Sequence, residues 1–191
     1  MKNNLTQLET LLDYNFKNKE LLIQALTHSS ASADNYEKLE FLGDSLLSSY
    51  VTKHIFNYTN LKVGEMSTLR SNLVSTTSLS NIILEYGINK FVILGDSLAN
   101  NSTHITNILA DIFESLLAAI YIDGGESQSL KFVNKFLLSS FNENVVVDYK
   151  TKLQELIQKH YNGTKIEYRE LGHTGPSHDL TFNIGLFLNG E

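Results

Sequence analysis

The stretch NYEKLEFLGD, residues 35–44, places three carboxylates at helical spacing. Glu37, Glu40 and Asp44 are three and four residues apart, so a helix would carry them on one face. Like charges on neighbouring turns repel each other and favour protonation unless a cation lies between them. The spacing therefore indicates a cation site.

A second acidic pair lies in the otherwise apolar run ILADIFESLLAAIY, residues 108–121. Asp111 and Glu114 are three residues apart and are again neighbours on a helix. Oxygen donors with no His or Cys nearby in sequence favour the hard cations Mg²⁺ or Mn²⁺ over zinc. For each acid on its own, a solvated helix face or an N-cap is the alternative interpretation.

Helices must position these acids. Apolar residues recur every three or four positions from Leu5 to about Ser140, no strand pattern interrupts them, and the single proline is Pro176. The Ser-rich segment 67–80 fits a helix with its hydroxyls exposed. The clearest helical periodicity is in Leu21–Leu26, Leu39–Tyr50, Leu69–Leu84 and Ile108–Ile122.

The composition changes after Asn142, where strand patterns appear. The fold class expected is mostly α: a helical domain over residues 1–142, followed by a partial α+β domain over residues 148–191. In the second domain we expect a helix at Tyr149–His160, a strand at Ile166–Leu171, a loop at Gly172–His178 and a strand at Leu180–Leu188.

Composition limits the location and the partners. The chain has 42% apolar residues and no cysteine, which excludes disulfides and thiolate metal sites. Neither a signal sequence nor a run approaching the roughly 20 apolar residues of a membrane span is evident, so we expect a soluble cytoplasmic protein without membrane association. A net charge of −6 with only two arginines argues against a nucleic-acid partner, but cations bound at the acidic clusters would offset this charge locally.

The segments NYEKLEFLGDSLL and LADIFESLLAAIYIDGG closely resemble the two signature segments of bacterial ribonuclease III. The opening YNFKNKELLIQALTHSS, residues 14–30, resembles the first helices of that family. The segment Gly64–Ser67 with Arg70 resembles the family's turn into a further helix. The resemblance covers nearly the whole chain.

This resemblance implies an all-helical endonuclease domain that hydrolyses double-stranded RNA to 5′-phosphomonoesters and processes structured precursors such as rRNA and mRNA. It assigns Glu40, Asp44, Asp111 and Glu114 as ligands of Mg²⁺, for which Mn²⁺ can substitute. Asp44 and Glu114 would be catalytic, and Glu37 would be a further acid in the same cleft. Two divalent-ion clusters in a homodimer would cut the two strands of a duplex.

Three residues near the acids have other interpretations. Phe41 either packs in the core of its own chain or, as the resemblance implies, anchors the interface of the homodimer. Gly43 is expected to allow close helix packing. His28 is expected to satisfy a local hydrogen bond and to brace the first acidic helix rather than to act in catalysis.

The terminal segment resembles the first part of a double-stranded-RNA-binding domain, through DYKTKLQELIQ, IEYREL and GPSH. The third strand and the basic second helix of such a domain are expected to be missing from this sequence, whose last residue is Glu191. By resemblance, the RNA-binding residues are Thr151, Gln154, Glu155, Pro176 and His178, reading duplex shape in the minor groove. For Gln154 and Glu155 an ordinary solvent-facing stripe is the alternative.

The chain departs from the family pattern at two places. Val63 stands where the family carries a Glu, and His104–Asn107 lacks the usual basic residue and Glu, so altered substrate fit or slower turnover is expected. Two other functions compete with the nuclease. One is a non-catalytic scaffold that binds double-stranded RNA or a ribonucleoprotein, and the other is a di-iron bundle, which would need Glu-x-x-His pairs that Glu37, Glu40 and Glu114 do not form.

Overall fold

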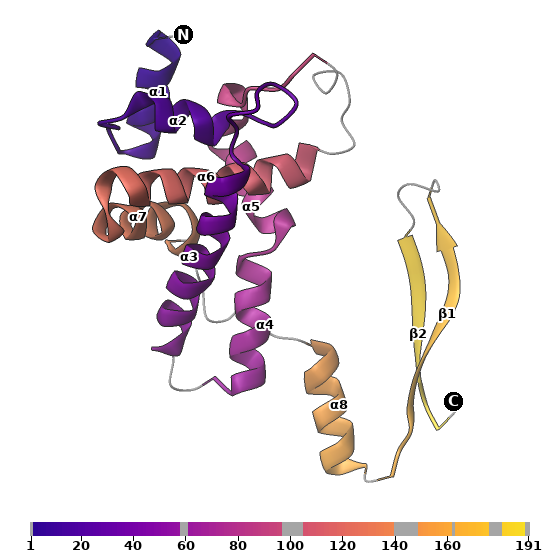
Figure 1. Ribbon diagram of the computed structural model, residues 1–191. Coiled ribbons are helices and arrows are strands. Elements are labelled where there is room, and N and C mark those ends of the chain that lie inside the picture. Colours follow the sequence, from indigo (N-terminus) through magenta and orange to yellow (C-terminus); the bar gives the residue numbers. More distant parts are fainter. Residues whose placement is uncertain are drawn as a thin grey trace. The chain divides into compact units, whose positions relative to one another are not determined.

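The computed structural model describes residues 2–57, 61–96, 105–139, 149–161, 163–175 and 181–189 (Figure 1). The chain divides into two compact units, residues 1–146 and 147–191. The first unit is helical in all its described elements. These are α1 (Lys2–Leu12), α2 (Lys19–Leu26), α3 (Glu37–Phe56), α4 (Val63–Leu73), α5 (Thr76–Glu85), the 3₁₀ turn η1 (Ile88–Phe91), α6 (Ile105–Gly124), α7 (Glu126–Val133) and the π-helical turn η3 (Asn134–Leu138).

Helix α6 is the core of the first unit. It packs against α2, α3, α5 and α7 (Figure 1). Its residues Ile112, Phe113 and Leu116 are completely buried. By length and composition alone α6 would pass for a membrane-spanning helix, which the sequence interpretation did not foresee, but 61% of its 18-residue apolar stretch is buried inside the unit, as in the core helix of a folded domain. The other helices around α6 supply the apolar environment that its composition requires.

The Ser-rich segment forms two helices rather than the single helix that its periodicity predicted. Helix α4 ends at Leu73, and Ser75 caps α5 by accepting a hydrogen bond from the amide of Ser78 at 3.2 Å. A serine hydroxyl competes with the backbone for such bonds, which favours a helix start over a helix interior.

Asp123, near the end of α6, fastens the connection between α1 and α2. Its carboxylate accepts hydrogen bonds from the Tyr14 hydroxyl at 2.6 Å and from the amides of Lys17 and Asn18 at 2.8 and 2.9 Å. Asn18 in turn caps α2 by accepting from the amide of Glu20 at 3.0 Å. One side chain thus fixes the first two helices to the core helix.

The second unit consists of α8 (Tyr149–His160) and an antiparallel hairpin of β1 (Ile166–Thr174) and β2 (Thr181–Leu188). The helix has its predicted bounds, but β1 continues three residues beyond Leu171 because His173 and Thr174 still pair with β2. A register shift between Glu170 and Gly172 accompanies this extension, at a glycine with φ of 143°. The expected fold class, mostly α with a small α+β segment at the C-terminal end, is confirmed.

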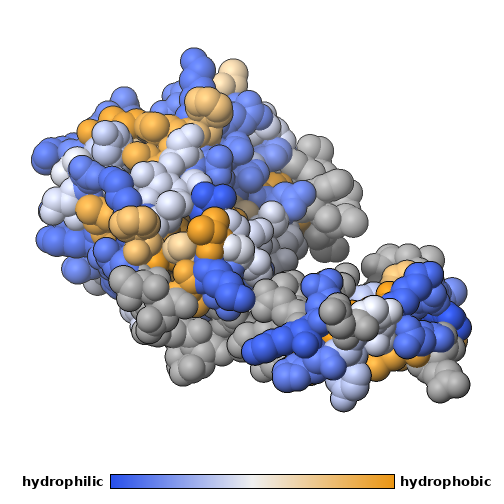
Figure 2. Space-filling model, turned by 90° about the horizontal axis from the view of Figure 1, so that it is seen from below, coloured by the Kyte–Doolittle hydropathy of each residue, from blue (hydrophilic) through white to orange (hydrophobic). Residues whose placement is uncertain are grey.

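The hairpin keeps much of its apolar surface accessible. Alternate residues of β2 lie on one face of the sheet, and the four apolar ones among them are between 38% and 55% exposed. Figure 2 shows hydrophobic (orange) residues at the surface of this unit among hydrophilic ones. The four residues are Phe182, Ile184, Leu186 and Leu188.

Candidate active site

Helix α3 begins at the first acidic residue of the site. The amide of Glu37 donates to the side-chain oxygen of Asn35 at 2.9 Å, and the amide of Glu40 donates to the carbonyl of Tyr36 at 2.9 Å. Both acids lie in the first turn, where the partial positive charge of a helix N-terminus stabilises carboxylates. Local structure therefore favours acidic residues at this position before any ligand binds.

The other two acids of the site, Asp111 and Glu114, are half-buried on core helix α6. The approach of α3 to α6 is set by Gly43, because a Cβ atom there would overlap the backbone carbonyl of Glu114. Only glycine leaves room for this contact. The expectation that Gly43 permits close helix packing is confirmed, and the packing brings the acids of the two helices together.

Glu40, Asp111 and Glu114 form the acidic cluster. Each offers a carboxylate oxygen, and these oxygens all lie within 4.8 Å of one another. Asp44 and Glu37 are exposed and outside this group, but the charge of Asp44 acts on Glu114 and the charges of both act on Glu40. The structure thus brings three of the four expected ligands within reach of one ion and places Asp44 close to them.

The cluster favours proton uptake when no cation is bound. Burial raises the pKa of Glu114 to about 8, and the negative charges of Asp44, Asp111 and Glu40 contribute to this rise. Burial is also the main cause of the raised pKa of Glu40, again with the neighbouring acids contributing. A divalent cation can replace the proton as the compensating charge.

The donor set fits a hard cation. All three ligands are carboxylate oxygens, which suit Mg²⁺ and Mn²⁺, whereas zinc sites usually include nitrogen or sulfur donors. Asp111 has a raised pKa because of burial, and a hydrogen bond from Tyr36 acts in the opposite direction. The cluster could therefore hold a metal ion with Glu40, Asp111 and Glu114 as its direct ligands.

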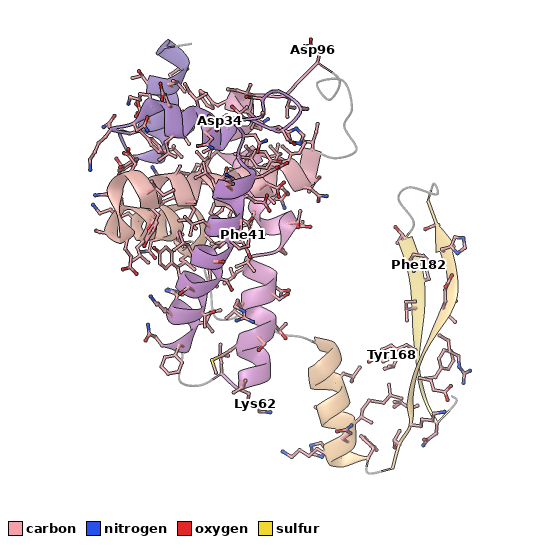
Figure 3. The ribbon with its side chains drawn as sticks, viewed as in Figure 1. Asp34, Phe41, Lys62, Asp96, Tyr168 and Phe182 are labelled. Atoms are coloured by element: carbon pink, nitrogen blue, oxygen red, sulfur yellow. The ribbon has the colours of Figure 1, made fainter. Side chains whose placement is uncertain are left out.

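Phe41 lies on α3 between the acids, and its side chain is 79% exposed (Figure 3). Packing in the core of its own chain, one of its two expected roles, is therefore excluded. The interface role stays a prediction.

His28 lies in the loop that leads to the site. Its Nδ1 accepts a hydrogen bond from the Ser30 amide at 2.9 Å and lies 2.9 Å from the Ser30 hydroxyl. The expected local hydrogen bond is thus confirmed. The ring also packs edge-on against Tyr36, a residue that the sequence interpretation did not single out.

The expected RNA-binding residues are only partly covered by the structure. Thr151, Gln154 and Glu155 lie within α8, whose described features do not include these side chains, and Pro176 and His178 lie outside the described residues. Of the two departures from the family pattern, Val63 is the exposed first residue of α4. The other, at 104–107, begins outside the described residues and continues into the first turn of α6.

The chain is similar to known proteins over nearly its whole length. A family model described as Ribonuclease-III-like matches residues 18–141. The chain is 37% identical to Ribonuclease 3 of Clostridium perfringens, over 98% of this chain and 84% of the relative. It is 38% identical to Ribonuclease 3 of Legionella pneumophila, over 100% of this chain and 87% of the relative.

Solved structures identify the fold of the first unit. A nuclease domain of ribonuclease III from Campylobacter jejuni matches with a TM-score of 0.68 and 32% identity, over 73% of this chain and 97% of that one. Dicer from Pichia stipitis, at 24% identity and a TM-score of 0.51, shares the fold. The chain belongs to the ribonuclease III family.

Proposed function

We propose that the protein is an endoribonuclease that hydrolyses phosphodiester bonds in double-stranded RNA at the acidic cluster, with Mg²⁺ as its cofactor. The observation that carries the proposal is the convergence of Glu40, Asp111 and Glu114 from two helices onto one point. Family membership over nearly the whole chain supports the same activity. Products with 5′-phosphomonoesters, and structured rRNA and mRNA precursors as substrates, are part of this proposal.

The proposed ligands are Glu40, Asp44, Asp111 and Glu114, with Mn²⁺ able to substitute for Mg²⁺. A bound divalent ion supplies positive charge for the phosphate oxygens and lowers the pKa of a coordinated water. The chain's own contribution is to hold the four carboxylates at fixed positions on two packed helices. Glu114 and Asp44 are the proposed catalytic residues, and Glu37 adds negative charge at the edge of the cleft.

The partners follow from the same proposal. The protein would bind double-stranded RNA and act as a homodimer in the cytoplasm, with Phe41 at the dimer interface. A related nuclease domain, that of ribonuclease III from Campylobacter jejuni, has structural flexibility in a region involved in dimer formation. In the second unit, the proposed RNA contacts are Thr151, Gln154, Glu155, Pro176 and His178.

A cleavage assay on long duplex RNA tests the function. The wild-type chain should cut in Mg²⁺ and stop in EDTA. Glu114→Gln should lower the cleavage rate by at least about 100-fold. Loss of an outer-shell partner can already cost a metal site up to about 100-fold, and Glu114 is a proposed direct ligand. Glu85→Gln, which removes an exposed acid at the end of α5, is the control and should cut normally.

Two results would contradict the proposal. If Glu114→Gln still cuts at the wild-type rate in Mg²⁺, the cluster is not the active site. If the wild-type chain binds duplex RNA without cutting it in Mg²⁺ or Mn²⁺, the non-catalytic scaffold is the better interpretation.

A further inference from the structure

Tyr36 connects the two helices that carry the acidic cluster. Its backbone carbonyl accepts the hydrogen bond from Glu40 on α3, and its hydroxyl lies 3.0 Å from Oδ2 of Asp111 on α6. Its side chain is only 3% exposed although it borders the cluster. Tyr36 is therefore bonded to one acid of each helix.

The hydrogen bond between Tyr36 and Asp111 has a fixed direction. An ionised carboxylate such as that of Asp111 has no hydrogen to donate and can only accept a hydrogen bond. The hydroxyl must then donate to the carboxylate oxygen. A donor on Oδ2 limits rotation of the carboxylate and so determines where Oδ1 lies.

The loop before α3 holds the tyrosine in place. The amide of Tyr36 donates to the carbonyl of Thr27 at 2.9 Å. The His28 ring packs edge-on against the phenol at a centroid distance of 5.6 Å. His28 itself is held by Ser30, whose hydroxyl also accepts from the amide of Gly95 at 3.0 Å. The phenol thus has both a backbone anchor and a packed neighbour, which limits its choice of rotamer.

We propose that Tyr36 is a positioning residue for the metal site: its hydroxyl holds the Asp111 carboxylate in the orientation in which Glu40, Asp111 and Glu114 share one divalent cation. The inference rests on the proposed function. Outer-shell donors of this kind orient metal ligands, and their loss commonly weakens metal binding by about 10–100-fold. Tyr36 would act only through Asp111 and would not itself contact the ion.

Tyr36→Phe tests the proposal, with Tyr50→Phe as a matched control. Tyr50 lies on α3 and is also 3% exposed, and its hydroxyl lies 2.8 Å from that of Ser129. Each variant keeps the ring and removes one buried hydroxyl. Binding of Mn²⁺ to the full chain without RNA is measured by electron paramagnetic resonance, and thermal unfolding in EDTA compares the folds.

Tyr36→Phe should raise the dissociation constant for Mn²⁺ by about 10–100-fold, and Tyr50→Phe should leave it unchanged. In the duplex cleavage assay, Tyr36→Phe should need more Mg²⁺ but approach the wild-type rate at saturation. In NMR spectra of the wild-type chain with ¹³C-labelled tyrosine rings, Mg²⁺ should shift the ring signals of Tyr36 and not those of Tyr50. This last measurement does not depend on the stability of a variant.

Two results would overturn the inference while leaving the proposed function standing. One is wild-type Mn²⁺ affinity in Tyr36→Phe, and the other is equal weakening by both variants, which would indicate a general loss of rigidity. A wild-type chain that neither binds Mn²⁺ nor cuts duplex RNA would overturn the proposed function and this inference with it.

Discussion

Glu114 combines the opposing requirements of the site in one side chain. It lies on the core helix, where burial disfavours its charge, and it faces three other acids that disfavour it further. The residue is useful to a nuclease only when ionised. Its raised pKa therefore links protonation, metal binding and stability of the first unit.

The first prediction concerns stability in EDTA. The pKa of Glu114 is about 8 in the folded chain against an ordinary value of 4.5, so between these pH values the folded chain holds a proton that the unfolded chain releases. The stability that this bound proton contributes should therefore be complete below about pH 4.5 and should be lost as pH rises through about 8. The wild-type melting temperature should fall by several degrees more than that of Glu114→Gln between about pH 5.5 and 8.5.

The control for this prediction is Mg²⁺, which should restore the wild-type melting temperature at the higher pH because it binds the folded chain. If the melting temperatures of wild type and Glu114→Gln fall in parallel with pH in EDTA, Glu114 does not carry the raised pKa.

At the residue scale, the sequence was most informative where helical spacing applies. The spacing of Glu37, Glu40 and Asp44 identified the acids of α3, and the Asp111–Glu114 pair identified those of α6. Tyr36 could not be found in this way, because its bond to Asp111 spans 75 positions and depends on the packing of two helices. Spacing also could not distinguish Asp44, which is exposed, from the half-buried Glu40.

At the element scale, the contact between α3 and α6 is the feature on which the site depends. The second prediction is that Gly43→Ala destabilises the fold by at least about 3 kcal/mol, because the added methyl group meets the backbone of Glu114 and the helices must separate. Metal binding should be lost with it. Urea unfolding monitored by circular dichroism measures the change.

Gly64→Ala is the matched control for Gly43→Ala. Gly64 is also helical, but among the described residues no atom outside its own stretch of helix lies within 4 Å of a Cβ added there. Alanine should stabilise α4 by up to about 1 kcal/mol through lower backbone entropy in the unfolded chain. Equal effects of the two substitutions would show that close helix approach is not the reason for Gly43.

The third prediction concerns the attachment of α1 and α2 to α6. Burial raises the pKa of Asp123, but hydrogen bonds from Tyr14, Lys17 and Asn18 outweigh this effect, and the pKa is lowered overall. Asp123→Asn leaves one acceptor oxygen where the carboxylate has two, so it should cost about 1.5–3 kcal/mol near neutral pH. The difference from wild type should shrink as pH falls through the lowered pKa, because the wild-type carboxyl then loses its charge too.

Asp34→Asn, at an exposed position in the loop before α3, controls for the change in net charge. Chemical unfolding at about pH 7 and pH 3 provides the comparison. An unchanged stability in Asp123→Asn near neutral pH would show that this carboxylate does not hold the helices together.

The elements themselves were largely predictable, because apolar periodicity marks amphipathic helices and alternation marks strands. Two errors have physical causes. The Ser-rich segment kept its apolar period through Val74 and Ser75, so only the capping bond of Ser75 reveals the break between α4 and α5. The apolar character of α6 was not foreseen because Asp111 and Glu114 interrupt its apolar run, whereas the whole helix is apolar enough to pass for a membrane span by length and composition alone and is mostly buried in the core.

At the scale of the whole molecule, the exposure of Phe41 connects the site to assembly. The Phe41 side chain is 79% exposed and directly follows Glu40 of the cluster, so covering it with a second copy would lower the free energy of the assembly. The fourth prediction is that Phe41→Ala weakens a homodimer, as measured by sedimentation equilibrium. Phe56→Ala, at the other end of α3 and 76% exposed, is the control and should leave the dimer intact.

A wild-type chain that stays monomeric at micromolar concentrations would contradict the dimer. So would a dimer that Phe41→Ala leaves as stable as wild type.

We expect carboxylates from α3 and α6 to hold one hard cation together. Anomalous diffraction from a crystal soaked in Mn²⁺ shows where this cation binds. We expect a peak at about 2.1 Å from oxygens of Glu40, Asp111 and Glu114. An active protein whose Mn²⁺ peak lies elsewhere, or is bound by residues of only one of the two helices, would contradict this expectation.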